Sequence, residues 1–113
     1  MKYATLNLET EKPTVDEAIA LIEREIEICK KIGIVVLKVI HGYGSSGSGG
    51  AIKKALKTWS IMAKRRKLFR DFVKGEEWNF NNEKSDEIKK LCPDVLGDLE
   101  LYYSNPGISL IVI

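Results

Sequence analysis

The amino-acid sequence predicts a two-layer α/β domain whose elements follow the order β-α-β-α-β. One observation is an amphipathic helical pattern that starts at Val15 and ends before Gly33. The others are a nearly continuous apolar, mostly β-branched run at residues 34–40 and a similar run at residues 108–113. Helices and buried strands that alternate along one chain favour helices packed on a sheet. A chain of 113 residues suits one domain, which we assign to residues 1–113.

The first strand and the first helix are predicted from alternation and from capping residues. In residues 3–8, Leu6 and Leu8 alternate with polar neighbours, as in a strand with one covered face. Thr14 and Glu17 have the spacing of a capping box, in which each side chain bonds to the backbone amide of the other residue. The helical stripe stops at Gly33, a residue suited to the left-handed conformation that ends helices.

The apolar run at residues 34–40 predicts a strand that is buried on both faces and therefore central in the sheet. Because a helix separates it from the first strand, the two strands should be parallel and joined by a right-handed crossover. This arrangement places His41 and the glycines that follow it at the carboxyl edge of the sheet, where open α/β folds usually bind ligands.

The remaining elements are predicted from shorter patterns. A second amphipathic helix is expected around residues 52–63, with Lys53, Lys54 and Lys57 turned away from its apolar stripe. A strand is expected at residues 68–73, followed by a short helix that ends before Pro93. Two further strands are expected at residues 99–103 and 108–113, joined by a turn at residues 104–107.

Charge is separated along the chain although the net charge is only +2. Residues 51–74 hold nine basic side chains and one acidic side chain, a net charge of +8, so the rest of the chain carries −6. A basic segment directly after a glycine-rich stretch favours a phosphate-bearing partner. The alternative is a solvated helix face followed by a basic turn.

The glycine-rich stretch does not fit the common nucleotide-binding motifs. Gly42 to Gly47 formally matches G-x-G-x-x-G, but a basic run, Lys64 to Lys67, lies roughly 20 residues further on where a dinucleotide site has an acidic residue. The P-loop pattern also fails, because no Lys-Ser or Lys-Thr pair follows the last glycine. A nucleotide-hydrolysing site is therefore not expected.

Three short motifs resemble the Smr (small MutS-related) domain family, which has an H-G-x-G loop and a terminal G-x-T-x-V-x-L strand. They are Glu17-Ala18, then Ile40-His41-Gly42-Tyr43-Gly44 with Ile52-Lys53, and Gly107-Ile108-Ser109-Leu110-Ile111-Val112-Ile113. The resemblance implies an Smr-type sandwich with an insertion at residues 74–105, which would add a helix and a strand before the C-terminal strand. The family's early L-D-L-H motif reads Leu6-Asn7-Leu8-Glu9 here, so its aspartate and histidine are replaced.

The resemblance implies a module that binds branched or structured DNA or RNA and that, in some members, nicks it. The residues agree, since glycines at a helix N-terminus expose backbone amides to an anion, and His41 can orient a phosphate or exchange a proton near neutral pH. We therefore predict a structure-selective module that holds a backbone phosphate through contacts drawn from His41, Gly42, Tyr43, Gly44, Lys53, Lys54, Lys57, Arg65 and Arg66.

Two other functions stay open. In an endonuclease, His41 would act as general acid or base, while Glu9 would activate water or bind Mg²⁺ or Mn²⁺. No other cofactor is expected. In a protein-interaction domain, the insertion would supply a contact surface that includes Trp78, Phe80, Tyr102 and Tyr103. For His41 itself, the alternative to phosphate contact is a hydrogen-bonded structural role.

Two cysteines and the absence of long apolar segments bear on the cellular setting. Cys29 and Cys92 are far apart and lack metal-type spacing, so we expect reduced, structural thiols. No segment reaches the roughly 18 consecutive apolar residues of a spanning helix, and the N-terminus has no apolar signal-peptide region. We therefore expect a cytoplasmic domain with no membrane partner.

Overall fold

The protein is described by a computed structural model that covers residues 2–42, 49–79 and 83–113. Its strands are β1 (Tyr3–Asn7), β2 (Val36–Ile40), β3 (Asp71–Lys74) and β4 (Ile108–Val112). Its α-helices are α1 (Val15–Ile32), α2 (Gly49–Arg65), α3 (Glu83–Leu91) and α4 (Leu99–Tyr102), with two 3₁₀-helices, η1 (Gly75–Glu77) and η2 (Pro93–Gly97). The predicted β-α-β-α-β order is confirmed over the first three strands and two helices.

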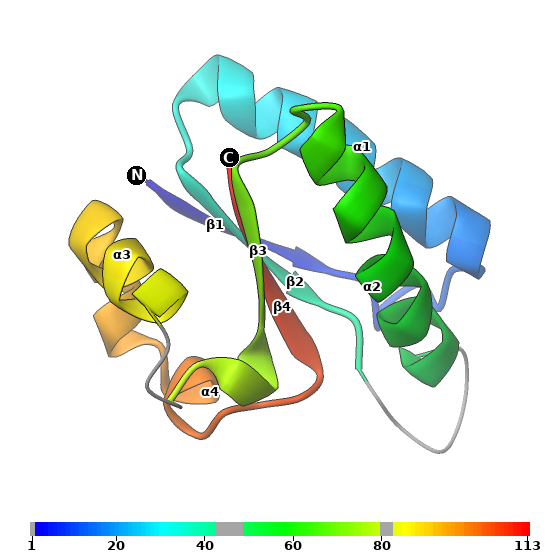
Figure 1. The fold of residues 1–113 in the computed structure, drawn as a ribbon. Coiled ribbons are helices and arrows are strands. Elements are labelled where there is room, and N and C mark those ends of the chain that lie inside the picture. Colours follow the sequence, from blue (N-terminus) through cyan, green and yellow to red (C-terminus); the bar gives the residue numbers. More distant parts are fainter. Residues whose placement is uncertain (1, 43–48, 80–82) are drawn as a thin grey trace.

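The four strands form one sheet in the order β1-β2-β4-β3 (Figure 1). β1 and β2 are parallel and start their pairing at Tyr3 and Val36, as expected from the helix between them. β4 lies antiparallel to both β2 and β3. The carboxyl ends of β2 and β3 and the start of β4 therefore meet at one edge of the sheet.

The predicted caps of α1 are confirmed. Thr14 Oγ1 accepts a hydrogen bond from the Glu17 amide at 3.2 Å, and the Glu17 carboxylate accepts one from the Thr14 amide at 3.0 Å. At the other end, Gly33 has a φ of 81°, and its amide bonds to the carbonyl of Cys29. Glycine is the residue that adopts this left-handed conformation without steric cost, so the helix ends there.

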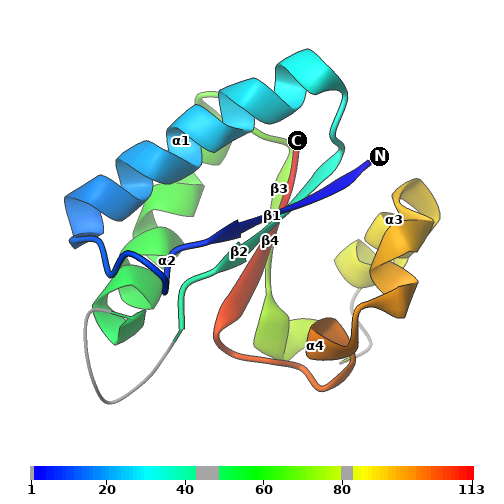
Figure 2. The same ribbon diagram turned by 180° about the vertical axis from the view of Figure 1, so that it is seen from behind.

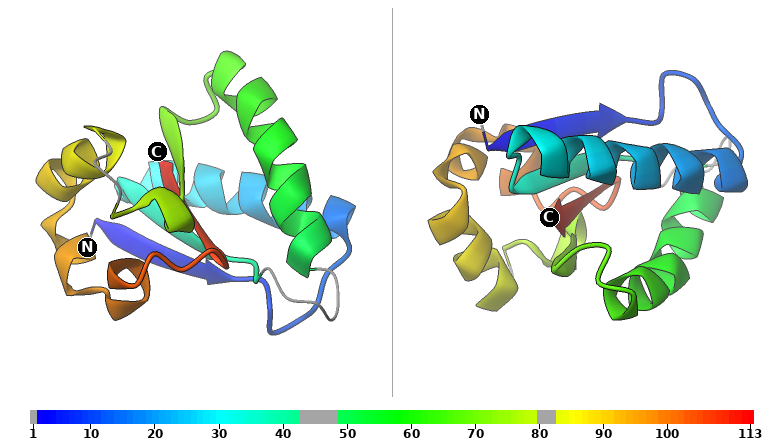
Figure 3. Two further views of the ribbon diagram at one scale, coloured as in Figure 1. Left: turned by 60° about the horizontal axis from the view of Figure 1, so that its bottom comes forward. Right: turned by 90° about the horizontal axis from the view of Figure 1, so that it is seen from above.

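The sheet is covered on both faces (Figures 2 and 3). α1 and α2 pack on one face, where Leu37, Val39 and Ile111 join their apolar residues in one core cluster. The segment from η1 to α4 covers the other face through a second cluster that includes Val36, Leu110 and Val112. Strand β2 contributes side chains to both clusters, as its continuous apolar run predicts. The segment beyond β3 thus adds a third layer to the expected two-layer core.

The predicted strand at residues 99–103 is wrong, because this stretch forms the short helix α4. The Asp98 side chain accepts from the Glu100 amide at 3.0 Å and caps the helix. Leu101 is buried whereas its neighbours Leu99 and Tyr102 are exposed, so one apolar residue anchors a single helical turn. The strand predicted at residues 68–73 is present but shifted to Asp71–Lys74, and Phe69 packs in the first core cluster instead.

Within the described residues, no helix combines the length and apolar character that crossing a membrane requires. Both cysteines are buried and unpaired, as expected. Burial raises the pKa of each thiol, so Cys29 and Cys92 stay protonated at neutral pH.

Candidate functional site

The end of β2 and the start of β4 are joined by one carbonyl group. The backbone amides of His41 and Gly42 both donate to the carbonyl oxygen of Gly107, at 2.9 Å and 3.0 Å. Gly42 adopts the left-handed region with a φ of 73°, which turns the chain out of the strand. The two glycine motifs that are 65 residues apart in sequence thus meet at the same edge of the sheet.

The ring of His41 is buried and both of its nitrogens are engaged. The residue is 2% exposed, with Nδ1 lying 2.5 Å from the carbonyl oxygen of Gly42 and Nε2 lying 2.9 Å from Ser109 Oγ. A carbonyl oxygen only accepts hydrogen bonds, so Nδ1 carries the proton. In the neutral ring Nε2 then accepts, and the Ser109 hydroxyl donates to it.

The surroundings of His41 favour this neutral ring. Burial lowers the pKa of His41 by disfavouring the charged imidazolium, and the ammonium of Lys53 lowers it further. The hydrogen bond to the Gly42 carbonyl opposes these effects without overcoming them. His41 is therefore neutral at physiological pH, with Nε2 as a basic nitrogen that faces a serine hydroxyl.

A basic pocket lies beside this histidine-serine pair. It has a volume of about 270 Å³ and is lined by Gly50, Lys53, Lys54, Lys57, Phe72, Lys74, Glu76 and Ser109. The sheet supplies Ser109 and Lys74, which are direct partners in the β3-β4 ladder, and α2 supplies the other lysines. Ser109, whose hydroxyl bonds to His41, is thus part of the pocket wall, while the lysines provide positive charge around it.

Lys53 is held in place by two contacts. Its Nζ donates to Glu76 Oε1 at 2.6 Å and to the carbonyl oxygen of Pro106 at 2.9 Å. The first contact ties α2 to η1, and the second ties it to the turn before β4. Because Glu76 balances its charge, Lys53 contributes less positive potential to the pocket than Lys54 and Lys57, which are exposed.

Glu9 lies close to the turn that follows His41. A β-carbon on Gly42 would sit 3.1 Å from Glu9 Oε2, so the carboxylate lies against the bare face of this glycine. The Asn7 side chain accepts from the Glu9 amide at 2.9 Å and shapes the turn after β1. The altered first motif therefore still places a carboxylate beside Gly42, the residue that follows the histidine, although Glu9 itself is exposed.

The other predicted residues fall into three groups. Lys54 and Lys57 line the pocket, as Lys53 does. Arg65 and Arg66 are exposed near the far end of α2, where Arg65 lies about 18 Å along the helix axis from Lys53. Tyr43 and Gly44 lie outside the described residues.

Five pocket residues were not predicted as site residues: Gly50, Phe72, Lys74, Glu76 and Ser109. Ser109 sits two positions after Gly107 in the terminal motif, and its alternation with buried neighbours resembles that of any core strand. Its role depends on the pairing of β4 with β3 and its nearness to His41, which the sequence pattern does not specify. Lys74 closes the basic segment, and the ladder with Ser109 brings it into the pocket.

The described residues do not offer a ready site for Mg²⁺ or Mn²⁺. Within residues 2–42, 49–79 and 83–113, no three His, Cys, Asp or Glu side chains are grouped closely enough to hold a metal ion. Near His41 the carboxylates are Glu9, which stands alone beside Gly42, and Glu76, which is paired with Lys53. These donors do not fit the several oxygen ligands that such cations require.

The residues expected to form a protein-contact surface separate in the structure. Trp78 is 4% exposed and packs in the second core cluster, with Lys89 Nζ 5.3 Å from its ring centroid, so its assignment to a contact surface is wrong. Tyr102 and Tyr103 are exposed, whereas Phe80 lies outside the described residues.

Fold and site together define the class of protein: a small α/β domain with a basic pocket at the sheet edge and a buried histidine behind it. The chain belongs to the Smr domain family, whose model matches residues 7–78, more than half of the sequence. This is a family associated with nucleic-acid binding and nicking.

A solved structure supports the same fold. The crystal structure of the Smr domain of Thermus thermophilus MutS2 is similar to this chain with a TM-score of 0.54 and 17% sequence identity. The similarity covers 99% of this chain and 96% of that chain. The comparison with curated proteins gave no match.

Proposed function

We propose that this domain binds structured nucleic acid by holding a backbone phosphate in the basic pocket between α2 and β3. The observation that carries the proposal is the convergence of three α2 lysines and Lys74 on one cavity at the carboxyl edge of the sheet. The matching Smr family, with its association with nucleic acid, supports the same function.

The charges around the pocket suit a phosphate. Lys54 and Lys57 are exposed, and Glu76 is already paired with Lys53, so the pocket keeps a net positive charge. Lysine is a mobile point charge that neutralises phosphate without reading base edges. Affinity should therefore depend on the shape of the backbone and on salt, and only weakly on base sequence.

His41 has an indirect part in this binding. Because both ring nitrogens are already bonded, the ring fixes Ser109 and the turn at Gly42 while Ser109 and the lysines face the pocket. The phosphate contact expected from His41 is thereby proposed for the pocket lysines, because the proton of the Ser109 hydroxyl is already donated to Nε2 of His41, and His41 acts as a positioning residue for Ser109 and the turn.

Binding measurements on matched lysine variants test the proposal. Fluorescence anisotropy would follow branched, duplex and single-stranded DNA and RNA between 50 and 200 mM salt. Lys54→Gln with Lys57→Gln should lower the slope of log K against log salt by about 1.8 for duplex DNA, since each lost phosphate contact removes about 0.9. Lys90→Gln, an exposed lysine of α3 behind the sheet, is the control and should leave the slope unchanged.

Two results would contradict the proposal. One is an equal loss of affinity in the Lys90→Gln control, which would indicate diffuse attraction without a pocket. The other is the absence of salt-sensitive binding to any of these nucleic acids. An equal affinity for branched and linear duplexes would remove the structural preference while keeping the phosphate site.

A second candidate function is nicking of a phosphodiester bond at the same pocket. The neutral His41, with Nε2 bonded to the Ser109 hydroxyl, favours it, because a neutral imidazole is the form that accepts a proton. Glu9 would lie on the other side of Gly42, and the lysines would stabilise charge that develops on the phosphate. In the described arrangement a water would attack the phosphorus and the sugar hydroxyl would leave, while Nε2 of His41 would accept the proton of the Ser109 hydroxyl as that hydroxyl takes one from the water.

Cleavage has to be followed over time in the binding mixtures, with Mg²⁺, with Mn²⁺ and with EDTA. His41→Gln should abolish the product if His41 exchanges the proton, while Glu9→Gln separates a chemical role of that carboxylate from the rest. If the wild-type domain binds and yields no product under any of the three conditions, binding remains and nicking is rejected.

A further inference from the structure

We propose that Tyr102 and Tyr103 form a stacking platform for unpaired bases of the nucleic acid whose phosphate occupies the basic pocket. This inference rests on the proposed function and names the substrate as one with unpaired nucleotides next to the bound phosphate. The platform is defined here as the side chains of these two tyrosines.

The two tyrosine rings are unusually open for aromatic side chains. Tyr102 is 67% exposed and Tyr103 is 75% exposed, and their ring centroids lie 5.2 Å apart in an edge-to-face arrangement. Neighbouring rings at right angles present one aromatic face and one edge to an incoming ring. Aromatic faces of this kind bind bases of any sequence, because every base has a π face.

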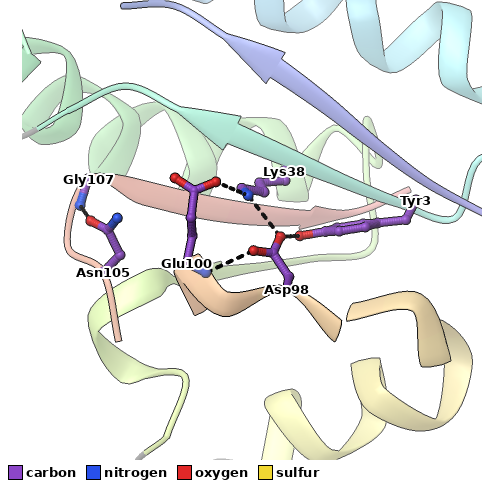
Figure 4. A network of polar contacts seen from close by, with 6 residues as sticks. All are labelled: Tyr3, Lys38, Asp98, Glu100, Asn105 and Gly107. Carbon is purple, nitrogen blue, oxygen red and sulfur yellow. Dashed lines mark hydrogen bonds and ion pairs between the residues drawn. The ribbon is translucent and has the colours of Figure 1, made fainter. Parts of the chain in front are cut away.

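The backbone that carries the platform is fixed to the sheet by a polar network (Figure 4). The buried Lys38 on β2 donates to Asp98 Oδ2 at 2.8 Å and to Glu100 Oε1 at 2.6 Å. The Tyr3 hydroxyl donates to the same Asp98 oxygen at 2.7 Å. Asp98 caps α4, so the helix that ends at Tyr102 is attached to β1 and β2 through three hydrogen bonds. A platform of this rigidity loses little freedom when a base binds.

The same network reduces the repulsion that a phosphate would meet near the platform. Asp98 and Glu100 are the acidic residues next to the tyrosines, and both carboxylates are bonded to the ammonium of Lys38. A paired carboxylate repels an approaching anion less than a free one. The platform is therefore compatible with a nucleic-acid strand that passes beside it.

A short turn connects the platform to the basic pocket. Gly107 follows Tyr103 by four positions, so their Cα atoms are at most about 14 Å apart. Along this turn the Pro106 carbonyl holds Lys53 of the pocket, and the Gly107 carbonyl holds His41 and Gly42. Figures 1 and 3 show the turn running from α4 to the start of β4, beside the end of β2.

The turn itself is well fixed. Asn105 Oδ1 accepts from the Gly107 amide at 2.8 Å, and a β-carbon at Gly75 would lie 2.1 Å from the Asn105 carbonyl oxygen, so η1 packs directly against the turn. Platform and pocket are thus held in a constant relation. Because α2 and α4 lie on opposite faces of the sheet, a strand with one phosphate in the pocket would pass around the end of the sheet, along this turn, to bring unpaired nucleotides to the tyrosines.

A paired set of ligands tests the inference. The first is a duplex with a four-nucleotide single-stranded extension, and the second is identical except that the extension carries abasic sites. Wild-type protein should bind the first ligand at least fivefold more tightly, since stacking on an aromatic side chain has this magnitude per base. The variant Tyr102→Ala with Tyr103→Ala should bind both ligands equally, while the two Tyr→Phe changes should keep the preference.

Leu99→Ala is the matched control, because Leu99 is 71% exposed on the same helix and offers no aromatic face. It should leave the preference for bases intact. Fluorescence of 2-aminopurine placed in the extension should fall on binding to wild type and not on binding to the tyrosine-to-alanine variant, which reports stacking directly.

The outcomes separate this inference from the proposed function. Salt-sensitive binding of both ligands with equal affinity by wild type overturns the platform and keeps the phosphate pocket. No binding of either ligand overturns both. If light scattering instead finds self-association that is lost on Tyr102→Ala with Tyr103→Ala, and the base preference is absent, the surface is a protein contact and the inference is wrong.

Discussion

Replacing Lys38 by methionine should destabilise the domain more than any exposed lysine substitution. Lys38 is 4% exposed in the central strand β2, and its ammonium is the cationic partner of Asp98 and Glu100. Methionine fills a similar volume but leaves the Asp98 carboxylate, whose side chain is 12% exposed, with hydrogen bonds from Tyr3 and the Glu100 amide alone. The variant therefore keeps the shape of the interior and removes the charge balance.

The expected loss follows from the burial of each partner. Breaking a buried pair by removing one member costs about 3–5 kcal/mol. Because the Asp98 side chain is 12% exposed and so partly hydrated, the loss should lie near the lower value, about 3 kcal/mol. The Glu100 side chain is 50% exposed, so its pairing adds little. An unfolding entropy of about 2.1 cal/mol/K per residue gives a fall in Tm of about 4 °C per kcal/mol for this chain, or about 12 °C in total.

Thermal unfolding followed by circular dichroism would measure the change, with urea unfolding as a second estimate. The double variant Lys38→Met with Asp98→Asn is the informative comparison, because a neutral amide removes the unpaired charge and should recover a large part of the loss. A fall in Tm below about 4 °C for Lys38→Met, or no recovery in the double variant, would refute the role assigned to this network.

Four further predictions concern acid stability, the histidine and two glycines. Burial would raise the pKa of Asp98, but the hydrogen bonds from Lys38 and Tyr3 outweigh burial and lower the pKa below its usual value. The stability that this carboxylate contributes is therefore fully present above about pH 4, the pKa in the unfolded chain, and is lost as the pH falls through the folded pKa. Asp98→Asn should thus flatten the acid limb of a pH series of urea melts, and a limb as steep as that of wild type would argue against this. His41 is the only histidine, so its imidazole signals in an NMR titration are unambiguous. They should report an Nδ1–H ring and a pKa below 6.5, because burial lowers the pKa, and a neutral Nε2–H ring would contradict the hydrogen bond from Nδ1 to the Gly42 carbonyl. Gly42→Ala places a side chain in the left-handed region and against Glu9, so the free energy of unfolding in urea should fall by about 1–2 kcal/mol. Gly97→Ala is the control, because its β-carbon would have open space around it, and it should lower the free energy of unfolding less. Gly75→Ala should destabilise more than Gly42→Ala, since backbone atoms of Asn105 and Ile108 would lie within 2.7 Å of the new carbon, and a smaller effect in the same urea series would contradict this close packing.

The parallel half of the fold was predictable because local signals agree there. The capping box of Thr14 and Glu17, the stop at Gly33 and the apolar run of β2 each specify one element, and all three are compatible with a β-α-β unit. The resemblance to the Smr family placed the H-G-x-G loop at the end of β2, and the family match confirms the membership. The position of His41 at the sheet edge followed from these elements.

The α4 segment could not be predicted for a physical reason. Its apolar residues fit a strand as well as a helical turn. The helical turn forms because Asp98, its cap, accepts hydrogen bonds from Lys38 and Tyr3 of the sheet. Tertiary contacts of this kind override weak local preference in a short segment. The role of residues 74–105 as an insertion stays a prediction.

The candidate site was predictable in its lysines and its histidine but not in its assembly. Lys53, Lys54 and Lys57 were expected to lie off the apolar stripe, and they line the pocket. Ser109 and Lys74 become neighbours only through the β3-β4 ladder, whose register depends on packing on both faces of the sheet. The burial of the His41 ring likewise depends on residues far away in sequence.

The position of β4 has a consequence for how the domain folds. This strand comes last along the chain yet lies between β2 and β3 in the sheet, and it carries Ser109 and follows the Gly107 carbonyl that holds His41. During synthesis the residues before β4 can form helices and the β1-β2 pair, but β3 has no neighbour to pair with until residues 108–112 are made. Long-range pairing of this kind is slow to form. The pocket that Ser109 lines therefore forms only after β4 has been made and has paired with β2 and β3.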